Sequence, residues 1–462
     1  MKHLLCLLAV VATGLTAIAA DKRPNLIVIM VDDMGYGDAG CYGGSAFPTP
    51  NLDRMAREGM KFTDFHSSGP VCSPTRAGLL TGRYQQRAGI AGVVYAAFKR
   101  NRHHGLQMKE ITFAEVLREA GYRTGMFGKW HLGYEEQYNP THQGFDRYVG
   151  YVSGNVDFHR HIDGAGVFDW WHQNKKTREQ GYTTHLITKH AVDFIKANKR
   201  DPFCLYIAHE APHDPYQGPD DPPVRKEGET KLIYDHREPV HAARAYREMM
   251  FEMDKGVGEV LDTVEKLGLA KDTFVMFFSD NGATGPGSCA GLYGMKGTLW
   301  EGGHRVPGLA WWPGRIKAGS TSRQLAITID VMPTLLDIAG IKAPGNLDGR
   351  SLGPFLFGGA RTEARRLFWQ YGNAKAMRDG RWKLVLNGGK PSKKALALPN
   401  IDWQRPSDGR DKIALFDLRQ SPNETVNLAA NQPKRVAAMR KAIADWEREV
   451  NSGATAQPEK KE

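Results

Sequence analysis

Cys72, Pro74 and Arg76 alternate along one short stretch of this chain, which places a potential nucleophile beside a fixed positive charge. Ser73 can cap a helix and Pro74 suits its first turn, so we expect a helix that Ser73 caps and that continues through Leu80, with Cys72 just before its N-terminus. Backbone N–H groups and the helix dipole favour anions at such a position, and Arg76 adds a second attraction. The stretch therefore predicts a site for a negatively charged group.

Two pairs of polar residues each follow a continuous apolar run, the pattern of a strand buried on both faces. The first pair is Asp32-Asp33 after residues 25–31, and the second is Asp280-Asn281 after residues 273–279. Carboxylate and amide oxygens suit Ca²⁺ or Mg²⁺, and neither pair contains the His or Cys that zinc usually takes. Either pair alone is also typical of a turn after a strand. Together they favour a divalent metal site.

Cys72 by itself permits several interpretations. A single cysteine is usually a small buried apolar residue, or it is a thiol nucleophile activated by a helix end. A thiol protease needs a histidine and an asparagine to orient each other beside the thiol, which the sequence does not exclude. A tyrosine-phosphatase loop needs an arginine six positions after the cysteine, and that position is Gly78. The tyrosine-phosphatase interpretation therefore fails.

The elements that must position these residues alternate between strands and helices. Two further strand-like runs, 203–208 and 123–127, lead into His209 and His213 and into Lys129 and His131. Helical patterns lie between the strands at residues 51–59, 112–119, 184–198 and 244–267. This order predicts an α/β fold with a large, mostly parallel sheet sandwiched by helices. Ligands bind such sheets beyond the carboxyl ends of the strands, so we expect the polar residues to meet there.

After residue 358 the pattern changes to short strands, at residues 367–371, 375–378, 382–386 and 413–418. Asp379-Gly380 is a strong hairpin signal between two of them, and residues 433–450 read as an amphipathic helix. We therefore expect the main domain at 21–358, a smaller C-terminal antiparallel α+β domain at 359–450, and a disordered polar tail at 451–462.

Residues 1–20 have the pattern of a secretory signal peptide. Lys2 precedes an apolar run at 4–12, and Ala17-Ile18-Ala19 offers a small-residue cleavage site. The run is short and interrupted, which makes a membrane anchor the weaker interpretation. The sequence thus predicts an exported protein, periplasmic or secreted, without stable membrane insertion.

The charge and cysteine content narrow the class of protein further. The formal net charge of +11 is spread along the chain rather than gathered in blocks, which disfavours a nucleic-acid partner and fits a polyanionic substrate. Four cysteines remain beyond the signal segment, too few and too scattered for a disulfide scaffold. One bridge, between Cys41 and Cys289, stays open as an alternative to free thiols.

The run Cys72–Arg83, with the sequence CSPTRAGLLTGR, resembles the signature of type I, formylglycine-dependent sulfatases of the alkaline phosphatase superfamily. The resemblance covers nearly the whole chain after residue 20. Its other motifs, in family order, are Asp32-Asp33, Gly128-Lys129-Trp130-His131-Leu132-Gly133, Ala211-Pro212-His213, Asp280-Asn281-Gly282 and the loop around Lys296. It implies an alkaline phosphatase-like fold and the hydrolysis of sulfate monoesters.

The same resemblance implies roles for these residues. A maturation enzyme oxidises Cys72 to formylglycine, and the hydrate of that aldehyde attacks sulfur. The implied metal ligands are Asp32, Asp33, Cys72, Asp280 and Asn281, with Ca²⁺ favoured over Mg²⁺. The other implied catalytic residues are the cations Arg76, Lys129 and Lys296, the acid His213 and the base His131. Outside these motifs the lysines and histidines would be interpreted as ordinary surface charges.

The substrate is less well defined by the sequence. Residues 155–171 mix histidine, arginine and aromatic residues in a predicted loop, which suits a sugar, and Asp157, His159 and His104 are candidate contacts. The arylsulfatase A and galactosamine-6-sulfatase-like members favour galactose or N-acetylgalactosamine sulfate, with aryl sulfates as assay substrates.

Two alternative functions remain at this point. A phosphomonoesterase or phosphodiesterase of the same superfamily would have a Ser or Thr nucleophile and a two-metal site with extra Asp and His ligands, which we do not find. A glycan-binding protein that has lost its maturation would not need the intact Cys72-Pro74-Arg76 core.

Overall fold

Strand β1 (Asn25–Val31) lies near the middle of a ten-stranded sheet. It pairs in parallel with β9 (Thr273–Ser279) on one side and with β8 (Phe203–Ala208) on the other. Strands β4 (Arg123–Lys129) and β5 (Arg147–Tyr151) extend the parallel part beyond β8. Every residue of β1 is buried, as its continuous apolar sequence predicts.

Antiparallel and short strands complete both edges of this sheet. The strand order is β11-β2-β10-β9-β1-β8-β4-β5-β6-β7. The outer strands are β2 (Met60–Phe62), β10 (Gly308–Trp311), β11 (Ser320–Ser322), β6 (Trp171–His172) and β7 (Lys175–Lys176), and a separate pair joins β3 (Phe65–His66) to β12 (Ala326–Ile327). The expected large, mostly parallel sheet is confirmed.

The structure is a computed structural model that describes residues 23–44, 46–96, 101–358, 364–388 and 412–459. The predicted signal peptide at 1–20 lies outside this part of the chain. Within it, no helix is long and apolar enough to cross a membrane.

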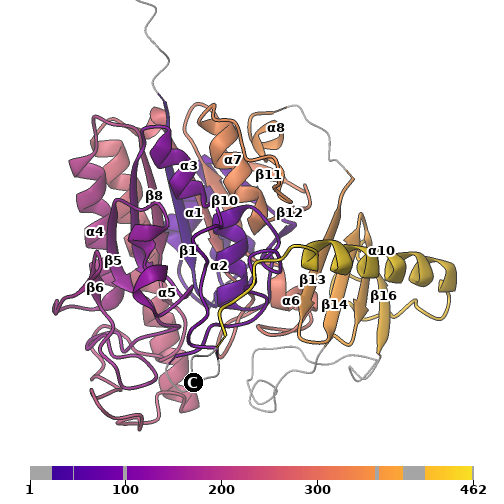
Figure 1. Cartoon of the computed structure of the whole chain (residues 1–462), viewed down its shortest axis with the longest axis horizontal. Helices are drawn as coiled ribbons and strands as arrows, with labels where there is room; N and C mark the ends of the chain where they lie inside the picture. The colour runs from indigo at the N-terminus through magenta and orange to yellow at the C-terminus, as the bar shows by residue number, and fades with distance from the viewer. Residues whose placement is uncertain (1–22, 45, 97–100, 359–363, 389–411, 460–462) are drawn as a thin grey trace, which may run out of the picture.

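Helices cover both faces of the large sheet, because alternate side chains of β1 point to opposite faces (Figure 1). Ile27 and Ile29 belong to a core with helices α1 (Pro50–Glu58), α4 (Thr183–Ala197) and α5 (Pro239–Lys266). Leu26 and Val28 belong to the core on the other face with helices α2 (Cys72–Thr81), α3 (Phe113–Glu119) and α7 (Val331–Ile338).

Short helical turns connect these elements. They are η1 (Gly40–Tyr42), η2 (Glu136–Tyr138), η3 (Pro140–His142), η4 (Ala270–Asp272), η5 (Thr328–Asp330), α6 (Glu301–His304) and α8 (Gly353–Leu356). Helix α3 has the strongest local start signal, since Thr112 and Glu115 form a capping box at its N-terminus.

The C-terminal part forms a four-stranded antiparallel sheet, as predicted (Figure 1). Its strands are β13 (Arg366–Tyr371), β14 (Ala374–Asp379), β15 (Trp382–Leu386) and β16 (Ile413–Asp417). Gly380 has a φ of 56° in the tight turn between β14 and β15, which explains the hairpin signal. Met377 and Leu384 pack on helix α10 (Pro433–Asn451).

The small sheet joins the large body through a buried polar network, called here the Lys383 cluster. Its members are Asp64, His66, Glu301, His304, Arg305, Arg378, Lys383 and Glu424. Lys383 Nζ lies 3.0 Å from both Glu301 Oε1 and Glu424 Oε1, and 3.1 Å from His304 Nε2. His304 Nδ1 lies 2.9 Å from His66 Nδ1, whose Nε2 reaches Asp64 Oδ1 at 2.8 Å. Because Lys383 only donates, His304 donates through Nδ1 and His66 donates to Asp64, so both rings are neutral.

The chain after α10 returns to the large body. Thr455 is buried and its N–H donates to Arg87 O at 2.7 Å, while Gln457 Oε1 accepts from Gly105 N at 3.0 Å. Thr455 and Gln457 thus contact the large body, whereas most residues around them are exposed, and the disordered tail expected at 451–462 stays a prediction. Cys41, Cys204 and Cys289 are free, as is Cys72, so the structure contains no Cys41–Cys289 bridge.

Candidate active site

Helix α2 carries the Cys-Ser-Pro-Thr-Arg motif, and all of its residues are buried. The helix begins at Cys72 itself, with Val71 in the N-cap position and no side-chain cap. The expectation that Ser73 caps the helix is wrong, because the Ser73 hydroxyl instead accepts the N–H of Val94 at 3.1 Å. Cys72 is therefore in the first turn, at the positive end of the helix dipole.

The two acidic pairs meet beyond the carboxyl ends of β1 and β9, as predicted. Val31 and Ser279 are in register on these parallel strands, so the residues that follow them leave the sheet together. Asp33 has a φ of 65°, and its N–H donates to Asp280 Oδ1 at 3.3 Å. Asn281 Nδ2 donates to Asp33 Oδ1 at 2.7 Å, which closes the group.

Three cations surround these carboxylates. Arg76 Nη2 bridges Asp32 Oδ2 at 3.1 Å and Asp280 Oδ2 at 3.0 Å. Lys129, the last residue of β4, donates from Nζ to Asp32 Oδ2. Lys296 Nζ lies 2.6 Å from Asp33 Oδ1 and reaches it from a loop that ends before α6. The structure thus brings together the acids and cations that lie far apart in the sequence.

The cations set the protonation of the acids. Burial alone would raise the pKa of Asp32, but Lys129, His213 and Arg76 lower it well below its usual range. Burial and then the neighbouring Asp32 raise the pKa of Asp280 to about 7. Burial opposes the charge of Lys296, yet Asp33 raises its pKa well above the usual value. The cluster therefore combines fixed positive and negative charges with one carboxyl, that of Asp280, whose pKa lies near neutral pH.

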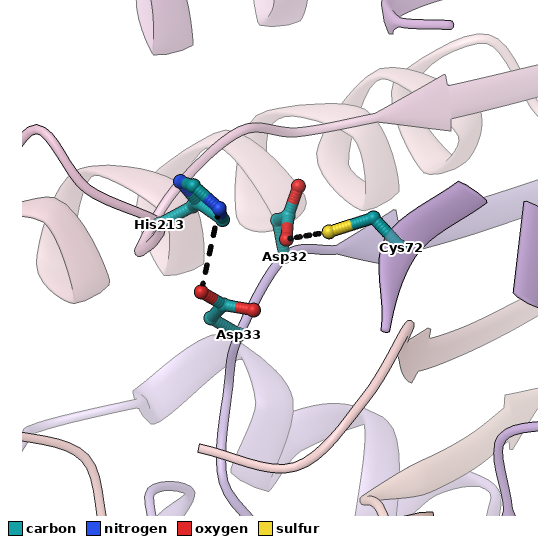
Figure 2. A group of neighbouring side chains, drawn as sticks. All are labelled: Asp32, Asp33, Cys72 and His213. Carbon is teal, nitrogen blue, oxygen red and sulfur yellow. Dashed lines mark hydrogen bonds and ion pairs between the residues drawn. The ribbon is translucent and has the colours of Figure 1, made fainter. Parts of the chain in front are cut away.

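Cys72 lies at the centre of this cluster. Its Sγ is 3.4 Å from Asp32 Oδ1, and His213 Nε2 lies 3.5 Å from Asp33 Oδ2 (Figure 2). Burial and then Asp32 raise the pKa of the Cys72 thiol to about 12. The thiol in this environment is protonated at neutral pH, which makes it a poor nucleophile as it stands.

The two histidines differ in their surroundings. His131 has a φ of 56° and its Nε2 lies 2.9 Å from Val94 O, while its Nδ1 is buried without a partner. Burial, Lys129 and Arg76 lower the pKa of His131 well below its usual value. His213 Nδ1 contacts Asp214 O at 2.5 Å, and burial followed by Lys296 lowers its pKa.

A cavity of about 230 Å³ opens from Cys72 to the surface. His131, His213 and Lys296 contribute to its lining together with residues 93–96. Tyr134, Ser153, Gly154, Asn155 and Gly164 form the rest of the lining. The lining thus combines aromatic residues with small and polar ones, and it includes Lys296 of the cationic cluster.

The acidic residues fit a metal ion by the chemistry of their donors. Ligand atoms of Asp32, Asp33, Cys72 and His213 lie within 4.8 Å of one another. Asn281 Oδ1 is buried without a hydrogen-bond partner, although an amide oxygen is a good acceptor. An ion bound beside these oxygens would satisfy Asn281 and share the carboxylates with the cations.

Sequence reasoning missed part of the rim and overestimated the role of the 155–171 segment. Asp157 accepts the N–H groups of Val224 and Arg225, so it holds a loop in place rather than facing the cavity. His159 and His104 do not line the cavity either, whereas Asn155, from the same predicted loop, does. Tyr134 follows the Lys129–Gly133 motif directly, and that proximity was the available signal.

Comparison with known proteins agrees with this geometry. The sequence profile of the Sulfatase family matches residues 24–341, well over half of the chain. The chain therefore belongs to the Sulfatase family and is a hydrolase of sulfate esters. N-acetylgalactosamine-6-sulfatase of Mus musculus is 36% identical over 402 residues, covering 79% of this chain and 72% of that protein. Arylsulfatase A of Homo sapiens is 33% identical over 464 residues, covering 91% and 86%.

Solved structures share the architecture over almost the whole chain. Ps i-CgsB in complex with k-i-k-neocarrahexaose has a TM-score of 0.78 at 25% identity and covers 95% of both chains. The phosphonate monoester hydrolase of Agrobacterium radiobacter has a TM-score of 0.63 at 20% identity, covers 94% of this chain and 96% of its own, and shows the shared fold. The alkaline phosphatase-like fold expected from the sequence is confirmed.

Proposed function

We propose that this protein is an exported sulfatase that removes sulfate from a sulfated carbohydrate, with residue 72 in its formylglycine form and one divalent metal. The observation that supports this most directly is the position of Cys72. It stands at the base of a cavity, between an acidic cluster and cations that could hold a sulfate group. No single residue of the cluster would make this case alone.

Asp32, Asp33, Asp280 and Asn281 are the proposed metal ligands, together with residue 72. Their oxygen donors favour Ca²⁺, with Mg²⁺ as the other candidate. When bound, the ion would supply positive charge to polarise a sulfate oxygen. Asn281 gives this proposal its own support, because its buried Oδ1 has no hydrogen-bond partner among the residues that the structure describes.

The proposed modification of Cys72 accounts for the unreactive thiol. A hydrated formylglycine would supply a hydroxyl nucleophile and a second hydroxyl for releasing sulfate. A thiol with a pKa of about 12 supplies neither. Arg76, fully buried on the same helix, holds Asp32 and Asp280 in place on either side of its guanidinium and adds fixed positive charge.

The lysines and histidines are proposed to divide the charge and proton steps. Lys129 and Lys296 bind the sulfate oxygens, which gain charge in the transition state. His131 is the proposed base, because its lowered pKa keeps the imidazole neutral and its Nδ1 is free to accept a proton. His213 is the proposed acid for the leaving alcohol, since it lines the cavity and the neighbouring Asp33 partly offsets the lowering of its pKa by burial and Lys296.

The proposed substrate class is a sulfated galactose or N-acetylgalactosamine unit. Two aromatic residues, Tyr95 and Tyr134, line the cavity with Asn155, a combination that suits a sugar ring. The guanidinium of Arg102 lies 5.1 Å from the Tyr134 ring and adds positive charge near the entrance. The name of the related mouse protein, N-acetylgalactosamine-6-sulfatase, supports the same class.

Mass spectrometry of the peptide that carries residue 72 tests this proposal. The protein should be made with its signal segment, in a host that has the maturation enzyme. We expect an aldehyde or its hydrate at position 72 and a new N-terminus near residue 20. Fully active enzyme with an unmodified thiol would contradict the mechanism. Release of sulfate from a panel of sulfated sugars, with an aryl sulfate as reference, then tests the substrate class.

A further inference from the structure

A second group of potential metal ligands lies at the far edge of the large sheet. His172 on β6, Glu179 in the loop after β7 and His190 on α4 offer ligand atoms that all lie within 4.8 Å of one another. His172 Nε2 is 2.9 Å from Glu179 Oε2. His190 Nε2 is 3.0 Å from Oε1 and 2.9 Å from Oε2 of the same carboxylate. We propose that this His172–Glu179–His190 group is a second metal site, specific for Zn²⁺.

The donor atoms already have the spacing of a coordination shell. Ligands at about 2.0–2.1 Å from zinc lie roughly 3 Å apart when they subtend a right angle, and a few tenths of an ångström more in a tetrahedron. The distances of 2.9–3.0 Å between imidazole nitrogens and carboxylate oxygens are close to that spacing. An ion therefore needs only a small outward shift of the three side chains and the loss of the Nε2 protons.

The surrounding residues orient the group. Trp170 Nε1 donates to Glu179 Oε2 at 3.1 Å, and the His190 ring stacks on Phe127 at 6.1 Å between centroids. Such contacts fix ligand orientation in known metal sites. His190 and His172, with Trp170, lower the pKa of Glu179 to about 2 against the effect of burial, so the carboxylate is ionised at neutral pH.

Partial exposure allows an ion and water to reach the group. The exposed fractions of the side chains are 37% for His172, 19% for Glu179 and 15% for His190. Two neighbouring lysines are engaged elsewhere: Lys176 Nζ donates to Phe168 O at 2.6 Å, and Lys189 pairs with Asp193 at 3.3 Å. Lys175, opposite His172 on β7, is exposed. Two imidazoles, one carboxylate and an open position are the ligand set of zinc.

A second group of the same composition in this protein already has a lysine in the place of an ion, and it shows how the proposed site differs. His66, Glu301 and His304 have the same composition and are also close together. There, the ammonium group of Lys383 lies 3.0 Å from Glu301 and 3.1 Å from His304 Nε2, where an ion would otherwise bind. Among the described residues, Glu179 pairs only with His172 and His190, and no lysine or arginine takes the corresponding place. The two sites of this protein would also select different ions, since the active-site ligands are mainly oxygens.

Metal at this site would stabilise the rim of the active-site cavity. Strand β6 continues from Asp169, whose carboxylate accepts the N–H groups of Val152 at 3.3 Å and Ser153 at 2.8 Å. Ser153 lines the cavity. Joining β6 to α4 through an ion would thus fix the segment that supports this side of the rim, without contact to the reacting atoms.

Titration of the enzyme with Zn²⁺ in excess Ca²⁺ tests the proposal. We expect one zinc per chain, with a Kd in the micromolar range or tighter, and visible absorption bands when Co²⁺ replaces it. His172→Ala and Glu179→Gln should each weaken binding by at least about 10-fold. His185→Ala is the matched control, because His185, on the surface of α4, also pairs with a glutamate, Glu252 of α5, at 2.8 Å, but lacks a second histidine. It should leave zinc binding unchanged.

Two results would overturn the proposal. One is that the wild-type enzyme binds no zinc under these conditions. The other is that binding survives unchanged in both His172→Ala and Glu179→Gln, which would place the ion elsewhere, for example at His103 and His104 or in the active site. Because His172 is the most exposed ligand, its variant should unfold at the wild-type temperature without zinc, and Glu179→Gln provides the second test if it does not.

Discussion

The active-site cluster and the Lys383 cluster are both built from three carboxylates and three cations. In the active site these are Asp32, Asp33, Asp280, Arg76, Lys129 and Lys296, and in the Lys383 cluster they are Asp64, Glu301, Glu424, Arg305, Arg378 and Lys383. The Lys383 cluster is closed, since Lys383 is fully buried and contacts two acids and a histidine. The active-site cluster faces a cavity, and Lys296 retains 18% of its exposure.

The difference lies in what each cluster could still bind. The histidines of the Lys383 cluster are committed to a chain of hydrogen bonds, from Lys383 to Asp64. In the active site, His131 Nδ1 and Asn281 Oδ1 are buried without partners. A divalent ion shared by the carboxylates would leave the lysines in excess, and an anion at the cavity base would restore the balance. The same number of charged residues thus stabilises the fold in the Lys383 cluster and serves ligand binding in the active site.

The largest expected effect is on the reaction. Cys72→Ala should lower the rate of sulfate release by at least about 10⁴-fold, as expected when a nucleophile is removed. The side chain is small and lies at the base of a cavity, so the unfolding temperature should stay close to that of the wild type. Steady-state kinetics and calorimetry measure the two. Substantial residual activity would show that residue 72 is not the nucleophile.

The Lys383 cluster should respond in the opposite way. Lys383→Met removes the buried cation that lies 3.0 Å from both Glu301 and Glu424, and leaves Glu301 with its longer contacts to Arg305 and Arg378. Loss of this buried partner should cost about 3–5 kcal/mol of unfolding free energy, which denaturant unfolding measures. Adding Glu301→Gln and Glu424→Gln should recover part of it, because the excess negative charge is then removed. A single variant as stable as the wild type would contradict the view that this cluster serves cohesion.

Lys296→Met is the matched active-site variant. It should lower kcat by about 10²–10³-fold, the usual loss when one charge-stabilising group is removed. Its effect on unfolding should be smaller than that of Lys383→Met, because Lys296 and the cavity beside it are open to water. If the two lysine variants lost equal stability, the distinction between an open and a closed cluster would fail.

The smallest expected effect is a dependence of stability on pH. Burial lowers the pKa of His66, and burial with Lys383 lowers that of His304 well below its usual value. The unfolded chain therefore binds more protons than the folded one below about pH 6.5, so stability falls as the pH falls.

His304 should contribute a loss of about 1 kcal/mol between pH 6.5 and 5.5, because its pKa lies well below 6.5, and His66 adds a loss in the same direction. The raised pKa of Glu424 acts in the opposite direction and offsets part of this loss. Urea unfolding at the two pH values measures the total, to which other buried histidines also contribute. A His304→Gln variant with an unchanged pH dependence would exclude the Lys383 cluster as a source.

The strands and most of the active-site acids and bases could be predicted from the sequence because their signals are local. The buried strands at 25–31, 203–208 and 273–279 have the predicted bounds, since each is a continuous apolar run between polar residues. Their parallel arrangement then brings Asp32 and Asp280 together. The motif resemblance added Lys129, His213 and Lys296, which reach the site from three other segments.

The remainder depended on contacts that no local pattern encodes. Strand β5 was not predicted. Its outer edge pairs with the short antiparallel strand β6, and not with a parallel strand that a helix separates from it in the sequence. The start of α2 shifted by one residue because Ser73 binds Val94, twenty-one positions away. The sequence did not indicate the role of Lys383, because its partners lie in two segments distant from it, the short helix α6 and the loop that contains Glu424. The contacts of Thr455 with Arg87 and Glu110 were missed because these partners lie far away in the sequence.

The burial of all ten residues of helix α2 determines the order in which modification of residue 72 and folding can occur. Cys72 retains only 3% of its exposure, and the cavity above it is too small to admit another protein. Any enzyme that alters residue 72 must therefore meet it on a nascent or unfolded chain. Once helix α2 is buried against the sheet, such an enzyme can no longer reach residue 72. A molecule that folds before the modification therefore retains an unmodified cysteine at this position.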